Sequence, residues 1–195
     1  MTEVAPHRFD KDESCHRMSE NSNDRFLALT KYHRIETRQA TESQDKEEHI
    51  DFLIRRNQPT FSTIDIKAIK RSGGRKAAQK ENDHEWLWIE FQGRYQDYET
   101  KKMIPKTGWL YSNVDFIGFE QPDGFLIVNR EDLAILCDKI VDKENYISCA
   151  ADAIRKVYRR DIDIIAKIHL SDIKESRSKH GVEVRWYFLQ DEQII

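Results

Sequence analysis

Cysteine and long apolar runs are scarce in this 195-residue chain. The three cysteines, Cys15, Cys137 and Cys149, are far apart and form no Cys-x-x-Cys pair. This argues against both a disulfide framework and a cysteine-ligated zinc site. No apolar run has the length of a secretory or membrane-spanning segment. We therefore expect a cytoplasmic protein that does not enter a membrane.

The chain also lacks an excess of positive charge. It has 32 Lys and Arg residues against 35 Asp and Glu residues, which gives a formal net charge of -3. A nucleic-acid partner would therefore need a local basic patch. The sequence has no Gly-rich phosphate loop of the nucleotide-hydrolase type and no Gly-x-Ser-x-Gly elbow. None of the cysteines has a convincing partner for thiol catalysis.

The length suits one domain. Residues 1 to about 25 are polar and show no periodicity. We expect a flexible polar arm over residues 1–30 and a single domain over residues 31–195. His7, Cys15 and His16 suggest a metal site in this arm, but a disordered tail explains them better.

Local patterns predict the secondary structure of the remaining chain. Helical spacing or composition favours helices over 37–48, 131–141 and 149–159. Alternation and β-rich composition favour strands over 49–54, 61–69, 86–91, 114–120, 125–128 and 182–189. Residues 92–106 look like a long loop-like excursion between strands. Strands in the centre with helices at both ends predict a mixed α/β (α+β) fold.

Two acidic residues and one lysine fall in the first two predicted strands. Side chains alternate along a strand, so Asp65 and Lys67 share one face while Ile66 takes the other. Asp51 lies between apolar neighbours in the preceding strand. If the two strands pair, both carboxylates and the lysine converge. Two carboxylates can hold a hard cation such as Mg²⁺, and a neighbouring lysine can orient water, which suits metal-assisted phosphodiester hydrolysis.

The acidic-x-Lys pattern is short and occurs at 65–67, 99–101 and 172–174. Only Asp65 lies in an alternating apolar strand that follows another strand with an acidic residue. Asp172 follows Ser171, which looks like a helix N-cap, and together with Asp163 it stays a minor alternative. The competing interpretation of Asp65 is a solvent-facing sheet with a cross-strand salt bridge, which contributes about 0–1 kcal/mol.

Asp51, a turn and then Asp65-Ile66-Lys67 resemble the PD-(D/E)XK nuclease superfamily. The runs at 88–91, 108–111 and 115–120 extend this resemblance to its small phage or mobile-element members, over roughly residues 36–140. The resemblance implies a restriction-endonuclease-like central mixed β-sheet flanked by helices. It also implies that Asp51, Asp65 and the backbone carbonyl of Ile66 ligate Mg²⁺, with Mn²⁺ as a substitute, and that Lys67 positions the attacking water. One departure is Ile50, where the family has proline.

The family often adds an acidic residue from the first helix. Glu36, Glu42 and Asp45 compete for this role, and we favour Asp45 or Glu42. Glu90 is a further acid that could lie beside the site. His49 and His84 could be general bases, although a structural role explains each of them better.

A basic loop over residues 70–80 begins just past Lys67. Its Lys70, Arg71, Arg75 and Lys76 would contact phosphates without reading sequence, whereas the competing interpretation is a solvated loop. Together these features predict a Mg²⁺-dependent DNA endonuclease, resolvase-like or restriction-like. RNA stays open as a substrate, and a homodimer is suggested by analogy. The alternative is an inactive nucleic-acid-binding or protein-inhibitor module on the same fold.

Overall fold

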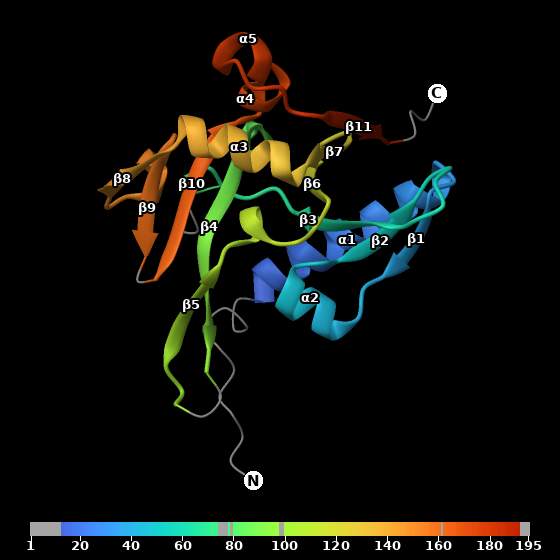
Figure 1. Ribbon diagram of the computed structural model, residues 1–195, viewed down its shortest axis with the longest axis horizontal. Helices are drawn as coiled ribbons and strands as arrows, with labels where there is room; N and C mark the ends of the chain where they lie inside the picture. The colour runs from blue at the N-terminus through green and yellow to red at the C-terminus, as the bar shows by residue number, and fades with distance from the viewer. Residues whose placement is uncertain (1–12, 74–77, 79, 98–99, 161, 192–195) are drawn as a thin grey trace.

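The computed structural model describes residues 13–73, 78, 80–97, 100–160 and 162–191. The fold is mixed α/β, which confirms the predicted class, and its strands form two mixed sheets (Figure 1). Within the described residues, no helix is long and apolar enough to cross a membrane.

The first sheet has six strands. Their order is β1 (Glu36–Gln39), β2 (Phe52–Arg55), β3 (Ser62–Lys67), β6 (Phe116–Gln121), β7 (Gly124–Asn129) and β11 (Trp186–Gln190). Neighbouring strands are antiparallel except for β3 and β6, which are parallel. A parallel pair needs a long crossover, and here the chain between β3 and β6 builds part of the second sheet.

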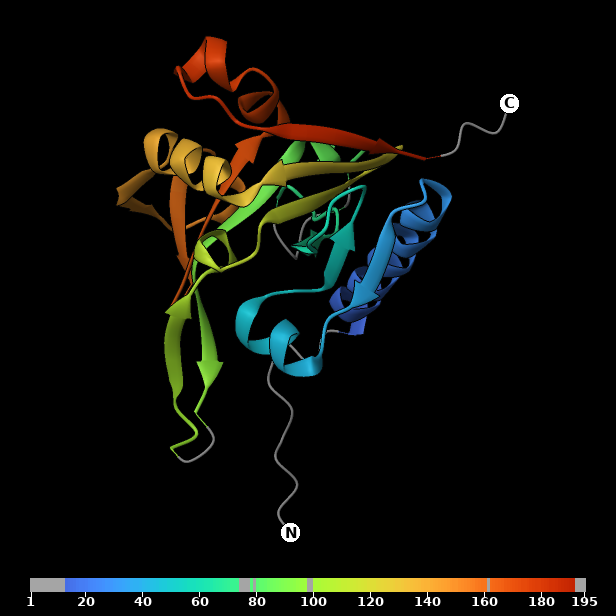
Figure 2. The same cartoon turned by 45° about the vertical axis from the view of Figure 1, so that its right-hand side comes forward.

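The second sheet has five strands. Their order is β5 (Met103–Thr107), β4 (Trp86–Gln96), β10 (Asp163–His169), β9 (Lys156–Arg160) and β8 (Asp142–Ile147). The β4–β5 hairpin projects beyond the rest of the molecule (Figures 1 and 2). Most of the predicted excursion at 92–106 is therefore regular strand.

Helices and short 3₁₀ turns connect and cover the sheets. The helices are α1 (Glu13–Tyr32), α2 (Glu42–Glu48), α3 (Arg130–Ile140), α4 (Leu170–Lys174) and α5 (Ser176–His180). The turns are η1 (Asp83–Glu85), η2 (Trp109–Tyr111) and η3 (Ala150–Asp152). A capping box at Thr41 starts α2, because its side chain accepts from Gln44 N–H and the Gln44 side chain accepts from Thr41 N–H.

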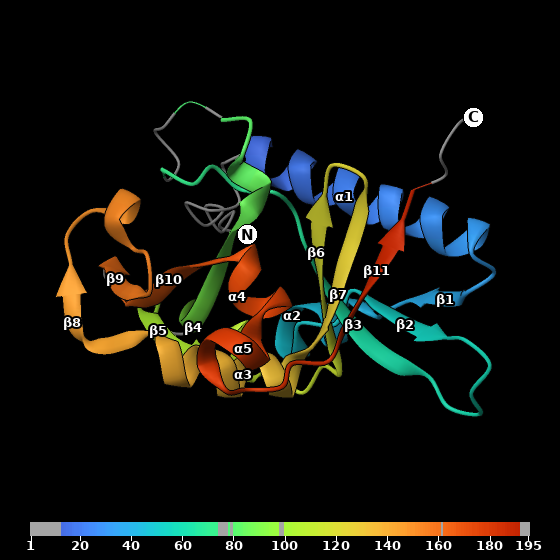
Figure 3. The same ribbon diagram turned by 90° about the horizontal axis from the view of Figure 1, so that it is seen from above.

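The predicted flexible arm is wrong over residues 13–30, which form most of α1. The Phe26 ring lies 5.5 Å from the ring of Phe52 and 5.3 Å from that of Phe125. Arg25 donates to the carbonyl of Gln121 at 2.8 Å, which fixes the helix to the β6–β7 turn. Figure 3 shows α1 running across the first sheet. Over residues 20–32 of α1, buried apolar residues are few, namely Phe26 and Leu29, and polar residues surround them in the sequence, so no apolar periodicity indicated the helix. Residues 1–12 lie outside the described range.

The predicted helix over 149–159 is also wrong. This segment forms η3 and then β9, which pairs with β10 on one side and β8 on the other. Arg155 has a left-handed backbone with φ of 50°, and its N–H donates to the carbonyl of Lys167 at 2.8 Å. A helix cannot run through such a residue, and the cross-strand bond commits the segment to the sheet.

Other predictions agree with the structure at the level of elements. Strands are present at 86–91, 114–120 and 125–128, and α3 covers the helix predicted over 131–141. The helix predicted over 37–48 begins later, because residues 36–39 form β1. The last strand, predicted over 182–189, is β11 and begins at Trp186.

Two apolar clusters hold the molecule together. One lies between α1 and the first sheet and includes Phe26, Leu29, Phe52, Ile64 and Phe125. The other joins the two sheets with α3, and includes Leu87, Ile89, Ile117, Leu133 and Ile168. The first cluster buries one face of β2 and β3, and therefore turns their alternate residues toward the opposite face.

Candidate active site

The structure brings Asp51, Asp65 and Lys67 together. Asp65 and Lys67 lie on β3, whose other face buries Ile64 and Ile66. Asp51 immediately precedes β2, and its N–H donates to the carbonyl of Ile64 at 3.0 Å, which continues the pairing with β3. The local alternation that predicted this convergence also produces it.

Short contacts fix the three side chains. Asp51 Oδ2 accepts from Ile66 N–H at 2.6 Å, and the Asp51 carboxylate lies close enough to Asp65 for its charge to raise the pKa of Asp65. Lys67 Nζ forms an ion pair with Asp65 Oδ2 at 2.6 Å. Among the described residues no other donor reaches this buried oxygen. Lys67 Nζ also lies 5.1 Å from the Trp109 ring centroid.

Burial and charge shift the acid–base properties of this group. Burial raises the pKa of Asp65 to about 7, against the opposing charge of Lys67. Burial also raises the pKa of Asp51, although the Ile66 N–H and Lys67 oppose this shift. Burial by itself lowers the pKa of Lys67, but the carboxylates of Asp65 and Asp51 outweigh it and raise the pKa. The lysine is therefore charged, and the two carboxyl groups compete for a proton.

His49 lies at the border of this site. It is the C-cap of α2 with φ of 59°, and its Nε2 is buried without a hydrogen-bond partner among the described residues. Burial, followed by the charges of Lys106 and Lys67, lowers the pKa of His49 to about 4. The imidazole is therefore neutral at pH 7.

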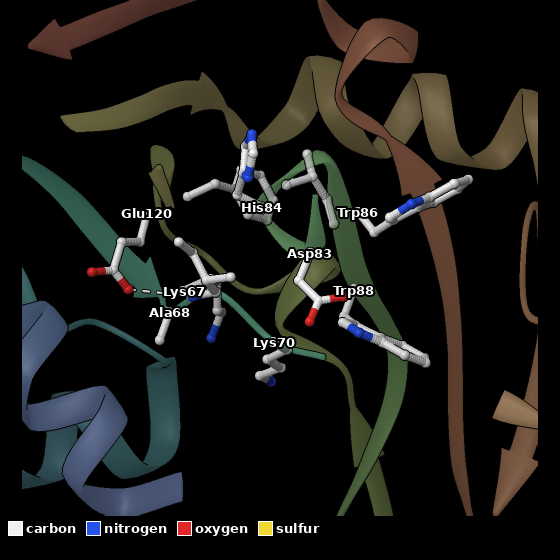
Figure 4. Close-up of a pocket in the computed structure, with 11 residues that line it drawn as sticks. Lys67, Ala68, Lys70, Asp83, His84, Trp86, Trp88 and Glu120 are labelled. Atoms are coloured by element: carbon white, nitrogen blue, oxygen red, sulfur yellow. Dashed lines mark hydrogen bonds between the residues drawn. The ribbon is translucent and has the colours of Figure 1, made fainter. Parts of the chain in front are cut away.

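His84 shares a small cavity with Lys67 of the site. This cavity, of about 20 Å³, lies beside the end of β3 and is also lined by Asp83 and Glu120 (Figure 4). This space suits about one water molecule. His84 Nδ1 lies 3.0 Å from the carbonyl of Glu81, which agrees with a structural role for this histidine.

The structure separates the candidate helix acids. Glu36 is on β1 rather than on a helix, and it forms ion pairs with Arg38 and Arg55. Glu42 and Asp45 are in the first turn of α2. The charge of Asp45 raises the pKa of Asp51, so Asp45 lies within electrostatic reach of the site.

Glu90 reaches the site from the second sheet. It lies on β4, and its charge contributes to the raised pKa of Lys67. The strand pattern suggested this acid only weakly, because nothing local places β4 against β3.

The basic loop after β3 is anchored at both ends. Asp83, which is buried, accepts from the backbone N–H groups of Ser72 and Lys80, each at 2.8 Å. Lys167 Nζ donates to the carbonyl of Ser72 at 2.6 Å. Lys70 and Arg71 lie at the start of this loop, whereas the predicted contacts Arg75 and Lys76 lie outside the described residues.

Sequence reasoning missed Asp83 and Lys167. Lys167 is 3% exposed in the middle of β10, and its Nζ lies 5.4 Å from the ring centroids of both Trp86 and Trp88. A lysine between Ala166 and Ile168, both fully buried, was the available signal for an unusual buried cation.

Asp172 and Asp163, the alternative acidic pair near the C-terminus, have structural roles. Asp172 is 1% exposed and pairs with Arg155, with His169 N–H at 3.0 Å and with His180 Nε2 at 3.2 Å. His169 is the N-cap of α4, so the predicted N-cap Ser171 is wrong. Asp163 pairs with Arg94 at 3.3 Å. Both acids thus have cationic partners.

The residues present would fit a hard cation with a small set of protein ligands. In the part of the chain that the structure describes, no group of three or more His, Cys, Asp or Glu side chains suits a metal ion. The ligands that the resemblance implies are Asp51, Asp65 and the backbone carbonyl of Ile66, of which the first two come together at β2 and β3. The buried oxygen Asp65 Oδ2 has no hydrogen-bond partner among the described residues apart from its ion pair with Lys67, so it is an atom that a bound cation could satisfy.

Comparison with known proteins does not assign this site to a family. No protein-family model, curated protein or solved structure matches the chain. The function therefore has to be argued from the side chains at β2 and β3.

Proposed function

We propose that this chain is a Mg²⁺-dependent endonuclease that hydrolyses phosphodiester bonds in DNA on a restriction-endonuclease-like sheet. One observation carries the proposal: the carboxyl groups of Asp51 and Asp65 meet at the β2–β3 pair, with the Lys67 ammonium 2.6 Å from Asp65. A buried carboxyl group and a half-buried one beside a charged lysine are costly unless they serve a cation or a substrate.

Each protein group has a defined part in this proposal. Asp51, Asp65 and the carbonyl of Ile66 would hold Mg²⁺, which prefers such oxygen ligands. When bound, the ion supplies Lewis acidity and lowers the pKa of a bound water. The hydrogen bond from Ile66 N–H fixes the orientation of Asp51. Lys67 would exchange its contact with Asp65 for the scissile phosphate and stabilise developing negative charge there.

DNA would be contacted by the basic loop. Lys70 and Arg71 begin three positions after Lys67, and the anchoring of Ser72 and Lys80 by Asp83 and Lys167 holds them near the end of β3. Arg75 and Lys76 belong to the same proposal on sequence grounds. Such phosphate contacts would position the substrate and give salt-sensitive binding.

The first test is cleavage of plasmid and branched DNA with Mg²⁺ or Mn²⁺. Asp65→Ala should reduce cleavage by more than about a hundredfold, because it removes the buried ligand. Asp123→Asn is the matched control, since this carboxylate is exposed in the β6–β7 turn. Calorimetric titration with Mn²⁺ should show binding that Asp65→Ala abolishes. Equal cleavage by the wild type and Asp65→Ala would place the activity elsewhere.

A second candidate is an inactive nucleic-acid-binding or protein-inhibitor module on the same fold. The Lys67–Asp65 ion pair favours it, because the ammonium already neutralises the oxygen that a metal would use. This candidate predicts no cleavage of DNA or RNA with either metal. Salt-sensitive binding without cleavage would select the nucleic-acid-binding form. Sedimentation of the free protein would test the homodimer suggested by analogy.

A further inference from the structure

The face of the first sheet opposite α1 carries more than the two carboxyl groups. In the β2–β3 register Phe52 is opposite Ile64, and both are buried beneath α1. The alternate residues therefore point to the other face, where Leu53 is opposite Thr63. The same alternation places Asp51 and Asp65 at one end of this face, and Arg55 and Phe61 at the other end.

Two guanidinium groups, one carboxylate and one aromatic ring form a compact cluster at that other end. The Arg38 guanidinium lies over the Phe61 ring, 4.2 Å from its centroid, and the Arg55 guanidinium lies 4.5 Å from the same centroid. Glu36 joins the two arginines, accepting from Arg38 Nη2 at 2.8 Å and from Arg55 Nε at 2.9 Å. We call Glu36, Arg38, Arg55 and Phe61 the stacked cluster.

The stacked cluster has the chemistry that recognises a nucleic-acid strand. Guanidinium groups donate to phosphate oxygens, and aromatic rings and guanidinium planes stack on bases. The 62% exposure of the Arg38 side chain leaves it open to a ligand. Two further exposed arginines adjoin these strands in sequence: Arg34 lies two positions before β1, and Arg56 directly follows β2. Positive charge thus gathers locally in a chain of net charge -3.

We propose that the stacked cluster binds the nucleic-acid strand that enters the Asp51–Asp65 site, about 13 Å from the scissile phosphate. The spacing follows from strand geometry, because Phe61 and Asp65 are four positions apart and each residue of a strand advances about 3.3 Å. The distance to the scissile phosphate rests on the proposed function, whereas the binding of nucleic acid by the stacked cluster does not.

Because of Glu36, the proposal predicts opposite effects on binding for two kinds of substitution. It holds both guanidinium groups in the free protein, and phosphates would have to replace it. Removal of the arginines should therefore weaken binding, and removal of the Glu36 charge should strengthen it. A cluster that only stabilises β1 against β2 would not respond with opposite signs.

The test measures binding without cleavage. Asp65→Asn protein in EDTA is titrated with labelled single-stranded and duplex DNA across a salt series, read by fluorescence anisotropy. In this background Arg38→Gln with Arg55→Gln should lower the slope of log K against log salt by about 1.4 for single strands and about 1.8 for duplex, since two phosphate contacts are lost. Glu36→Gln should bind more tightly. Lys139→Gln with Lys174→Gln, exposed on α3 and α4, is the matched control.

Two results would overturn the proposal. One is a salt slope for the double arginine variant equal to that of the lysine control; the other is weaker binding by Glu36→Gln. Phe61→Leu provides an uncharged check and should weaken single-strand binding at high salt, where stacking dominates. Hydrolysis of bis-para-nitrophenyl phosphate by the wild type with Mn²⁺ tests the catalytic centre separately. Its absence would count against the nuclease and the assigned spacing, while the binding comparison would still decide the cluster.

Discussion

At the scale of single residues, two similar Asp-x-Lys sequences have opposite environments. Asp65 is buried with an acidic neighbour and one lysine, and its pKa rises to about 7. Burial also acts to raise the pKa of Asp172, but hydrogen bonds from Arg155, the His169 N–H and His180 outweigh it and lower the pKa. The first environment suits a reactive site, and the second suits a structural ion pair.

The depressed pKa of Asp172 predicts a pH-dependent loss of stability. Its folded pKa lies below the unfolded value of about 3.9, so its contribution is present above that pH and is lost as the pH falls through the folded pKa. Asp172→Asn should cost about 1–3 kcal/mol of unfolding free energy at pH 7. Urea unfolding of both proteins at neutral and acidic pH measures this difference in unfolding free energy. A wild-type advantage that stays constant down to acidic pH would contradict the prediction; Asp123→Asn serves as the control.

At the scale of elements, α1 determines how the first sheet is buried. Phe26 is 1% exposed between Phe52 and Phe125. Phe26→Ala should therefore lower the unfolding free energy by about 3–5 kcal/mol, through lost burial and the cavity left behind. Asp24→Ala, at an exposed position of the same helix, should change it by no more than about 0.5 kcal/mol. Equal, small effects in denaturant unfolding would restore the flexible-arm interpretation.

The elements also show where local patterns succeed and fail. The spacing of Leu133, Leu136 and Cys137 predicted α3 because a helix that covers a core repeats its apolar residues every three or four positions. In contrast, β9 buries Val157 fully but leaves Lys156 and Arg159 exposed, so the pattern resembles a helix as much as a strand. Pairing with β10 decided between them.

At the scale of the whole molecule, the two sheets share one core. Leu87 and Ile168 from the second sheet belong to the same apolar cluster as Ile117 from the first sheet and Leu133 from α3. We therefore predict that the sheets unfold together in one cooperative transition, as a single domain. Tryptophan fluorescence and far-UV circular dichroism should give coincident denaturant curves. Two separated transitions would show that the sheets are independent units.

The sequence by itself determined the mixed α/β class and the meeting of Asp51 with Asp65 and Lys67. Both follow from local alternation and a short connection between neighbouring strands, which need no information from distant residues. The tertiary structure decided what surrounds them. It places a neutral His49 and the charge of Glu90 near Lys67. It also buries one face of α1 and brings two arginines to the Phe61 ring. These contacts join segments that are far apart in the chain or cross between strands, and no local periodicity specifies such neighbours.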